Sequence, residues 1–538
     1  MDGSLYTIFF QPHGVRTEVA EGKTVIEAAS EAGVDIDRHC GGVGVCGKCR
    51  ISAVKGEEFL SPPAQTEKKL LKKEEIEAGV RLACCAKVMG SGTIHVIDIV
   101  GTSGNQILEG TSERVISHWG PDRCGFGVAV DIGTTTVVCY LADLDSHEFM
   151  GSHSFLNPQV SYGDDVISRI AASTSNPGAL DRMQESLVKE LDSTLSVLAE
   201  DAGIEKEQIT EIVAAGNTVM EHIFLGVSPE SIGHSPYLPR FLTHPSILAS
   251  ELGFNIAQGG IVKVLPNVAG YVGADIVAGV AAHSMDKEKP LRLLVDIGTN
   301  NELVIGNEDS MYCCATAAGP AFEGARISQG MRASIGAIEK VEMTKEGISY
   351  KTIGNVLPTG LCGSGLIDVT AVMVSDGIID SRGRMKTKEE CNDERFRERL
   401  STDEARINRL LITEPENPVY ITQKDIREVQ LAVGAVKVGI EVMMEQLGIT
   451  VEDIDEILLA GAFGSNIDIK SAVTVGLLPK VELEKVRFIF NSSGLGACMA
   501  LASAGFYRET ERTMRKMKYI ELSTLPDFQK RFIRSMLF

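Results

Sequence analysis

The sequence predicts a small α+β domain followed by a duplicated α/β domain that fills most of the chain. Three observations support this fold class. Alternating strand patterns and a cysteine-rich loop occupy residues 1–98. A hydrophobic strand that ends in Asp-Ile-Gly occurs twice, at Asp131 and at Asp296. With 538 residues the chain exceeds what one hydrophobic core holds, so we expect several structural units.

The composition is that of an ordinary soluble globular protein, with 44% hydrophobic and 23% charged residues. Because the formal net charge is −21, we expect neither nucleic acid nor an anionic membrane as the main partner. The uncharged run 488–507 contains polar residues and glycines, and predicts a buried strand, turn and helix instead of a membrane span. Twelve cysteines without a secretory signal predict a reducing, cytoplasmic location.

The first 98 residues alternate between strand and helix patterns. Two segments with period-2 alternation flank a Pro-His-Gly turn, which predicts a β-hairpin, and small apolar residues at helical spacing follow. The predicted order is a hairpin of strands 6–11 and 15–20, a helix from Thr24, the cysteine loop, a strand over 50–54, a charged helix over 66–78 and a closing strand over 93–99.

The cysteine loop has the spacing of an iron–sulfur site. Cys40, Cys46 and Cys49 lie within ten residues and are separated by glycines, so their sulfur atoms and nearby N–H groups can converge. The pattern C-x5-C-x2-C is close to the plant-type 2Fe-2S run, and its fourth ligand is expected from Cys84 or Cys85. Zinc is the main alternative, but zinc sites usually pair two short hooks, and adjacent cysteines do not easily ligate one tetrahedral metal.

The order of elements, with the cluster loop after the first helix, is that of a β-grasp and resembles ferredoxins. The run Arg81-Leu-Ala-Cys84 is similar to the motif that carries their fourth ligand. The resemblance implies a 2Fe-2S cluster held by four thiolates, with Cys85 as a neighbour of the ligands. These four are Cys40, Cys46, Cys49 and Cys84.

From Gly127 onward the chain repeats itself. The Asp-Ile-Gly turns lie 165 residues apart, and the segment 202–216 recurs as 447–461 at an offset of 245. A looser pair joins 267–275 with 491–498. The difference between the two offsets places an insertion of about 80 residues in the second half. The expected boundaries are 1–98 for the first domain, 99–125 for a linker, 126–285 and 291–507 for the two halves, about 335–420 for the insertion and 508–538 for a tail.

The linker and the tail each leave two interpretations open. Fully extended, 99–125 spans roughly 80–90 Å at about 3.3 Å per residue, so it either lets the first domain move or packs on the next one. The tail mixes basic and large apolar residues, which is typical of an amphipathic helix that docks on the body, or else of a clasp for a partner.

Each Asp-Ile-Gly turn can hold a phosphate. A strand ends in an aspartate, and glycine and small polar residues then lead into the next strand, so N–H groups and hydroxyls face a phosphate while the carboxylate holds hydrated magnesium. One such turn can also be an ordinary hairpin. Two of them in a repeated fold indicate a nucleotide cleft between the halves.

This duplicated pattern resembles the ATPases of the actin, Hsp70 and sugar-kinase superfamily. The resemblance implies an actin-like (ribonuclease H-like) ATPase domain that binds ATP and Mg²⁺ and closes over the nucleotide. The carboxylates expected to act in hydrolysis are Asp131, Asp296 and Glu302. The residues expected to contact the nucleotide are Gly133, Thr134 and Thr135 in the first phosphate turn, Gly298, Thr299 and Asn300 in the second, and Gly461, Ala462 and Gly464 in the adenosine motif.

Other polar and glycine-rich positions remain open. Two glycine-rich runs, 318–325 and 359–368, either line the cleft or form tight structural turns. Glu302 and Asp275 either position water or metal, or have capping roles. His222 is expected to be a satisfied helix histidine. The cysteines 313, 314, 362 and 498 are expected to be small core residues instead of a second metal site.

The combination of the two domains resembles the reductive activators of corrinoid-dependent methyltransferase systems, and the resemblance covers nearly the whole chain. It implies that one electron passes from the 2Fe-2S cluster to inactive cobalt(II), regenerating cobalt(I) at the expense of ATP. The implied partners are a corrinoid protein and a low-potential donor, either a ferredoxin, a flavodoxin or a flavoprotein. It is also compatible with a homodimer.

Other functions are also compatible with parts of the sequence. Activators of 2-hydroxyacyl-CoA dehydratases resemble the ATPase part, but they hold a 4Fe-4S cluster between two subunits and lack the ferredoxin domain. The chain is also compatible with a redox-sensing ATPase or chaperone-like regulator, in which no electron leaves the cluster, or with a phosphotransferase.

Overall fold

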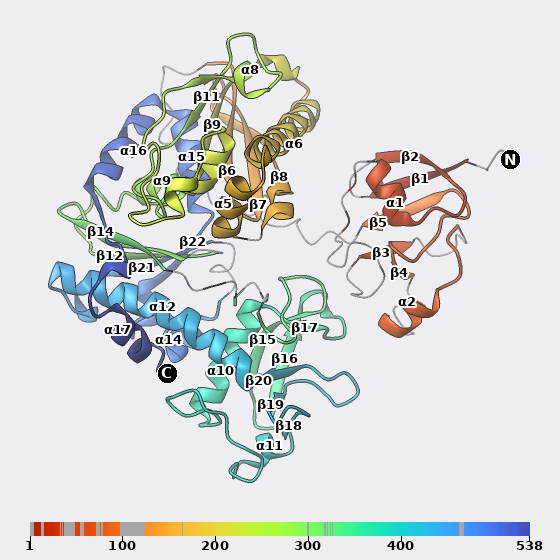
Figure 1. The fold of residues 1–538 in the computed structure, drawn as a ribbon, viewed down its shortest axis with the longest axis vertical. Coiled ribbons are helices and arrows are strands. Elements are labelled where there is room, and N and C mark those ends of the chain that lie inside the picture. Colours follow the sequence, from red (N-terminus) through yellow and green to blue (C-terminus); the bar gives the residue numbers. More distant parts are fainter. Residues whose placement is uncertain are drawn as a thin grey trace. The chain divides into compact units, whose positions relative to one another are not determined.

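The computed structural model describes residues 5–11, 15–32, 34, 36, 49–53, 59–71, 76, 79–96, 124–163, 165–298, 301–316, 319, 321–322, 324, 326–461 and 467–538. The chain divides into two compact units, Met1–Ile99 and Val100–Phe538, each with its own hydrophobic core. Figure 1 traces both units in sequence colours.

The first unit is a five-stranded mixed sheet in the order β2-β1-β5-β3-β4. β1 pairs antiparallel with β2 in the expected hairpin and parallel with the closing strand β5. The predicted β-grasp order is therefore confirmed. The elements are β1 (Leu5–Gln11), β2 (Val15–Ala20), α1 (Val25–Glu31), β3 (Arg50–Ala53), α2 (Gln65–Leu70), β4 (Val80–Leu82) and β5 (Gly92–Val96).

The charged helix predicted over 66–78 is interrupted. α2 ends at Leu70, because Leu71 has extended backbone angles and places its side chain in the core. Ile76 is helical again, and residues 72–75 and 77–78 lie outside the described residues. Packing of this leucine decides the helix end, and periodicity alone did not reveal it.

The second unit contains two six-stranded sheets that share an order of five strands and differ in the sixth, which is the edge strand β10 in the first and β23 in the second. Their orders are β10-β11-β9-β6-β7-β8 and β22-β21-β12-β13-β14-β23. In each sheet, the Asp-Ile-Gly turn lies within an antiparallel hairpin, β6–β7 or β12–β13. A later strand, β9 or β21, pairs in parallel with the first strand of that hairpin. The predicted duplication is confirmed. The strands are β6 (Phe126–Ile132), β7 (Thr136–Asp143), β8 (Glu148–Leu156), β9 (Ile209–Gly216), β10 (Ile247–Leu248), β11 (Ile261–Val264), β12 (Arg292–Ile297), β13 (Asn301–Gly306), β14 (Met311–Thr316), β21 (Glu456–Ala460), β22 (Val486–Phe490) and β23 (Met517–Tyr519).

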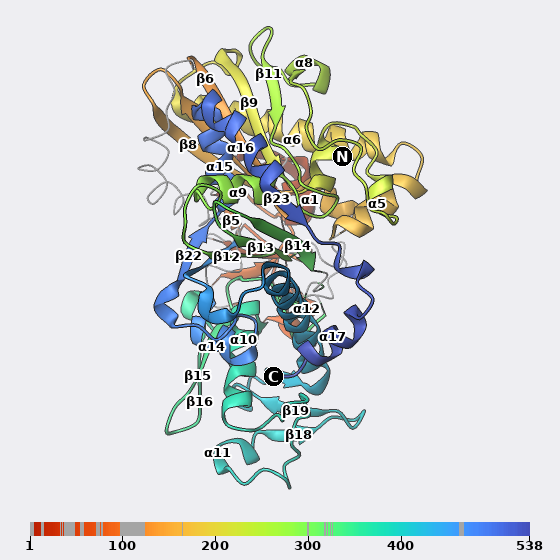
Figure 2. The same cartoon turned by 90° about the vertical axis from the view of Figure 1, so that its left-hand side faces the viewer.

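Two apolar helices, α9 (Ala274–Ala282) and α15 (Ser492–Ala502), lie between these sheets (Figure 2). α15 packs on β6 and β9 of the first sheet, whereas α9 packs on strands of the second sheet with one face and also contacts β9. The two helices cross closely, because a Cβ at Gly279 would lie 2.7 Å from Ser492 Oγ and a Cβ at Gly496 would lie 2.5 Å from the Ala278 carbonyl oxygen. Small residues thus allow the halves to share one central layer.

The remaining helices cover the outer faces of the sheets. α5 and α6 contact each other, and α6 also packs on β8. In the second half, α12 packs on β13 and β14. These helices are α5 (Val166–Ser175), α6 (Ala179–Ala202), α7 (Thr218–Phe224), α8 (Ala249–Leu252), α12 (Gln423–Leu447) and α14 (Ile469–Val475).

Between β14 and α12 the chain forms an additional region with two three-stranded sheets, ordered β16-β15-β17 and β18-β19-β20 (teal in Figure 1). α10 packs on β15 and on α14 and thereby joins this region to the second half. Its elements are β15 (Ala337–Met343), β16 (Ile348–Thr352), β17 (Gly360–Leu361), α10 (Gly363–Ser375), α11 (Glu394–Arg397), β18 (Leu400–Thr402), β19 (Asn408–Leu411) and β20 (Tyr420–Thr422).

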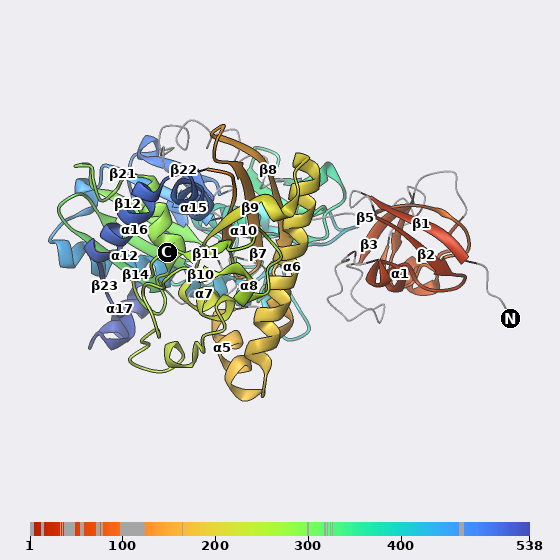
Figure 3. The ribbon, with the colours of Figure 1, turned by 90° about the horizontal axis from the view of Figure 1, so that it is seen from above.

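The C-terminal residues dock on the second unit (Figure 3). After α16 (Ala504–Lys516), β23 pairs in parallel with β14, and α17 (Phe528–Ser535) packs along α12. The Met536 carbonyl accepts a hydrogen bond of 2.8 Å from Gln430 Nε2. Among the described helices, none has the length and apolar character needed to cross a bilayer.

Candidate nucleotide cleft and cluster site

The first phosphate turn begins at Asp131, near the end of β6. Its carboxylate accepts two hydrogen bonds from the start of α15, one of 2.8 Å from Asn491 Nδ2 and one of 2.7 Å from Ser493 Oγ. Burial raises the pKa of Asp131 although both hydrogen bonds oppose the shift. Residues 360 positions apart in the chain therefore meet at this carboxylate.

Three buried side chains from other elements donate hydrogen bonds to this turn. Asn157 Nδ2 donates to the Gly133 carbonyl (2.9 Å), Arg169 donates to the Thr134 carbonyl (2.5 Å), and Asn217 Nδ2 donates to Thr134 Oγ1 (2.9 Å). A Cβ at Gly133 would lie 2.4 Å from the Thr136 carbonyl oxygen, so the turn requires glycine there. These supports are polar residues without a recognisable motif, and sequence reasoning missed them, although Asn217 lies in the Gly-Asn-Thr run that follows β9.

The second expected phosphate turn begins at Asp296, near the end of β12. In the β12–β13 hairpin, Asp296 lies opposite Glu302, which is buried. Gly461 has a φ of +85°, and a Cβ there would lie 2.7 Å from Asp296 Oδ1 and 2.4 Å from the Ile297 carbonyl oxygen. The first residue of the expected adenosine motif therefore touches the second phosphate turn. Thr299, Asn300, Ala462 and Gly464 lie outside the described residues.

Four carboxylates at the expected nucleotide cleft, called the cleft carboxylates below, influence the pKa values of one another: Asp131, Asp275, Asp296 and Glu302. Burial and the negative charge of Asp131 raise the pKa of Asp296 to about 7. Burial and the charge of Asp296 raise the pKa of Asp275 to about 7 as well. The pKa of Glu302 is raised well above its usual value by burial and by both neighbouring aspartates. Such a group favours a bound cation, because like charges disfavour one another in a buried site.

The carboxylates fit a hydrated ion better than a bare one. In the described part of the chain, no three His, Cys, Asp or Glu side chains are placed to hold a metal ion directly. Mg²⁺ usually keeps several waters and takes only one or two carboxylates beside the phosphates of a nucleotide. The site therefore fits magnesium that arrives with ATP.

The glycine-rich runs are described in part. In the second run, a Cβ at Gly365 would lie 2.1 Å from the Ile338 carbonyl oxygen, and Asp368 accepts a hydrogen bond of 3.1 Å from the Val341 amide. These residues fix α10 against β15. In the first run, a Cβ at Gly324 would lie 2.5 Å from the Met331 amide nitrogen.

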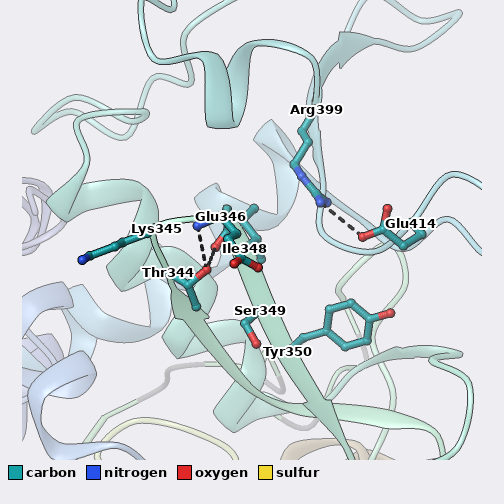
Figure 4. Close-up of a pocket in the computed structure, with 9 residues that line it drawn as sticks. Thr344, Lys345, Glu346, Ile348, Ser349, Tyr350, Arg399 and Glu414 are labelled. Atoms are coloured by element: carbon teal, nitrogen blue, oxygen red, sulfur yellow. Dashed lines mark hydrogen bonds and ion pairs between the residues drawn. The ribbon is translucent and has the colours of Figure 1, made fainter.

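A separate cavity lies in the additional region (Figure 4). It is formed by the turn between β15 and β16 together with Arg399 and Glu414, whose side chains form an ion pair of 3.3 Å. None of the four cleft carboxylates lines it. We assign it no part in nucleotide binding.

At the expected cluster site, two of the four proposed ligands are described. The Sγ atoms of Cys49 and Cys84 lie 3.2 Å apart, although 35 residues separate them in the chain. Cys85 Sγ lies 3.7 Å from Cys84 Sγ. Two sulfur atoms that converge from different segments fit ligands of one iron. Cys40 and Cys46 lie outside the described residues.

A buried ion pair fixes the segment that carries Cys84. Glu67 accepts bonds from Arg81 Nε (3.0 Å) and Nη2 (2.9 Å) and from the Leu82 amide (3.0 Å), and its side chain is fully buried. Burial alone would raise the pKa of Glu67, but these hydrogen bonds outweigh it and the pKa lies below its usual value. This contact was not predicted, because in the sequence Glu67 is one of several charged residues in a charged helix.

His222 and the four cysteines expected in the core, Cys313, Cys314, Cys362 and Cys498, are buried, as predicted. His222 is fully buried in α7, where Nδ1 lies 2.7 Å from the Thr218 carbonyl oxygen and Nε2 accepts a hydrogen bond of 3.0 Å from the Arg240 amide. Cys313 and Cys314 lie on β14 with their side chains in the core, and Cys362 and Cys498 are also buried.

Comparison with known proteins supports both kinds of domain. Three family models match the chain: "2Fe-2S iron-sulfur cluster binding domain" at residues 8–89, "RACo middle region" at 126–288 and "C-terminal domain of RACo the ASKHA domain" at 290–538. The corrinoid activation enzyme RamQ of Eubacterium limosum is 36% identical over 454 residues, which are 84% of this chain and 75% of RamQ. The chain belongs to the corrinoid reductive activators.

Two further corrinoid reductive activators extend the comparison. The [Co(II) methylated amine-specific corrinoid protein] reductase of Methanosarcina barkeri is 23% identical over 394 residues, 68% of this chain and 67% of that protein. A solved structure titled "Reductive activator for corrinoid,iron-sulfur protein" matches with a TM-score of 0.67 and 30% identity, covering 99% of this chain and 98% of the other. The similarity to this corrinoid activator thus includes both units.

Proposed function

We propose that this chain passes single electrons from a 2Fe-2S cluster to the cobalt(II) form of a corrinoid protein, regenerating cobalt(I), and that ATP hydrolysis drives the transfer. The observation that carries the proposal is the union of a 2Fe-2S domain and a duplicated nucleotide fold in a chain 36% identical to an enzyme named for corrinoid activation. A second relative is named as a reductase of a Co(II) corrinoid protein.

ATP is needed where an electron must pass to an acceptor of lower reduction potential. A plant-type 2Fe-2S centre lies near about −400 mV. An acceptor of lower potential stays reduced only if binding or hydrolysis supplies about 1.4 kcal/mol for each 59 mV of a one-electron step. Coupling the cluster to a nucleotide-driven closure supplies such energy.

The residues divide between the two tasks. Cys40, Cys46, Cys49 and Cys84 hold the cluster, which supplies the one-electron chemistry when bound. In the cleft, Asp131 and Asp296 hold hydrated Mg²⁺, and Asp275 and Glu302 orient the attacking water. Main-chain amides and side chains of the two turns contact the phosphates, namely Gly133, Thr134, Thr135, Gly298, Thr299 and Asn300. The adenosine lies against Gly461, Ala462 and Gly464.

The partners follow from this chemistry. A low-potential ferredoxin, flavodoxin or flavoprotein reloads the cluster, and the corrinoid protein takes the electron. We place this exchange in the cytoplasm.

The test is an anaerobic steady-state assay with a purified corrinoid protein in the cobalt(II) form. We expect the visible absorption of cobalt(I) to grow only when a low-potential reductant and Mg-ATP are both present, and ATP hydrolysis to accelerate when the corrinoid protein is added. ATP hydrolysis that is indifferent to the corrinoid protein, without any cobalt(I), would contradict the proposal and favour the redox-sensing ATPase.

A further inference from the structure

A buried carboxylic acid lies behind the nucleotide cleft, in α7. Glu221 is fully buried, as is every residue of this helix. One of its oxygens, Oε2, accepts a hydrogen bond of 2.6 Å from Asn267 Nδ2. The other, Oε1, is buried and has no hydrogen-bond partner among the residues that the structure describes. An unpartnered buried oxygen costs stability, so a glutamate kept here needs a reason other than packing.

Asn267 connects this acid to the start of α9. Its Oδ1 accepts a hydrogen bond of 3.0 Å from the Ala274 amide, the first N–H of that helix. Asp275, one of the four cleft carboxylates, is the next residue. The path from Glu221 to Asp275 therefore contains one asparagine side chain and one peptide.

The beginning of α7 also contacts the first phosphate turn. Asn217 caps the helix, accepting a hydrogen bond of 3.0 Å from the Met220 amide with Oδ1 while Nδ2 donates to Thr134 Oγ1. A Cβ at Gly273 would lie 2.5 Å from Asn217 Cα, so the start of α9 rests directly on the start of α7. α7 therefore bridges Thr134 and the residues that carry Asp275.

The duplicated fold supplies an independent comparison. In the looser sequence pair Asn491 is matched with Asn267. Asn491 directly precedes α15, and its Oδ1 accepts a hydrogen bond of 2.7 Å from the Gly494 amide. Its Nδ2 donates to Asp131. Asn267 lies further from its helix in the chain, before the N-cap Gly273 of α9, but it too accepts from an amide at the helix start and donates to a carboxylate, that of Glu221. Each repeat thus uses one asparagine to join a helix start to one carboxylate.

We propose that Glu221, acting through Asn267, is a positioning residue that holds Asp275 at a fixed place relative to the first phosphate turn during ATP hydrolysis. This inference rests on the proposed function and adds to it a support outside the cleft. Burial and the charge of Asp275 raise the pKa of Glu221 well above its usual value, which agrees with a neutral acid at this place. A glutamine at position 221 would then retain both the shape and the neutral charge of the protonated side chain.

The test compares ATP hydrolysis by Glu221→Gln, Glu221→Leu and Asn267→Ala. We expect Glu221→Gln to keep kcat within about threefold of the parent. Glu221→Leu and Asn267→Ala are expected to lower kcat by about tenfold to a hundredfold, because a small misplacement of a reacting group lowers the rate by up to about this factor. KM for ATP is expected to change less than about threefold in both. Asn255→Ala is the matched control, because Asn255 also donates from Nδ2 to a carboxylate, that of Asp192, on an exposed part of the same half.

The outcomes separate the inference from the proposed function. Unchanged kcat in Asn267→Ala, or a fall in kcat matched by an equal rise in KM, would overturn the inference. If Glu221→Leu does not fold, the contrast between Glu221→Gln and Asn267→Ala still decides, with thermal unfolding measured on both. Absence of ATP hydrolysis in the parent protein would instead contradict the proposed function itself.

Discussion

Asp131→Ala and Asp296→Ala are each expected to lower ATP-driven cobalt reduction by at least about a hundredfold, the scale of losing a preorganised charge at a reacting centre. Asp131→Ala removes the acceptor for Asn491 and Ser493, and Asp296→Ala removes the carboxylate that faces Gly461. The visible spectrum of the cluster is expected to remain unchanged in both, because the ferredoxin domain forms its own unit.

Asp309→Ala serves as the control for these substitutions. Asp309 is exposed in the turn between β13 and β14. This turn follows the end of β13, whereas Glu302 lies near the beginning of that strand, opposite its partner Asp296. We expect this variant to keep parental activity. Full activity of either cleft variant at saturating Mg-ATP would show that the carboxylate has no part in hydrolysis.

Cys84→Ser is expected to bleach or shift the visible absorption of the cluster, whereas Cys85→Ser is expected to leave it unchanged. Cys84 Sγ lies 3.2 Å from Cys49 Sγ, and iron–sulfur clusters of this type take four thiolates. Cys85 Sγ is adjacent to Cys84 Sγ at 3.7 Å, so each variant is the matched control for the other. Absorption and electron paramagnetic resonance after anaerobic reconstitution measure the effect. A normal spectrum for Cys84→Ser with a lost one for Cys85→Ser would reverse the ligand assignment.

The fold was predictable because its signals are local and repeated. The Asp-Ile-Gly turns, 165 residues apart, each encode a strand, a turn and a strand, and the structure places them at equivalent positions in two sheets that share an order of five strands. The ferredoxin hairpin follows from plain alternation of side chains. The packing of α9 and α15 against strands of the two different sheets was not visible, since nothing in a helix's own sequence says which sheet it covers.

The site was predictable only where its residues lie in motifs. Asp131, Gly133 and Asp296 stand in recognisable turns, but Arg169 and Asn157 reach the first turn from other elements. Glu67 shows the difficulty most clearly. In the sequence it is one charge among several in a charged helix, and only the fold turns it inward to Arg81. A single sequence does not reveal such burial, because it depends on tertiary contacts.

The central claim is that nucleotide hydrolysis drives an electron from the cluster to cobalt within one complex. The most direct measurement is a single-turnover experiment, in which protein with a reduced cluster is mixed anaerobically with one equivalent of cobalt(II) corrinoid protein. With Mg-ATP, we predict that cluster oxidation and cobalt(I) formation proceed at the same rate and in equal amounts, and that neither occurs with a non-hydrolysable ATP analogue. Equal cobalt(I) formation without nucleotide, or cobalt(I) appearing while the cluster stays reduced, would contradict the account.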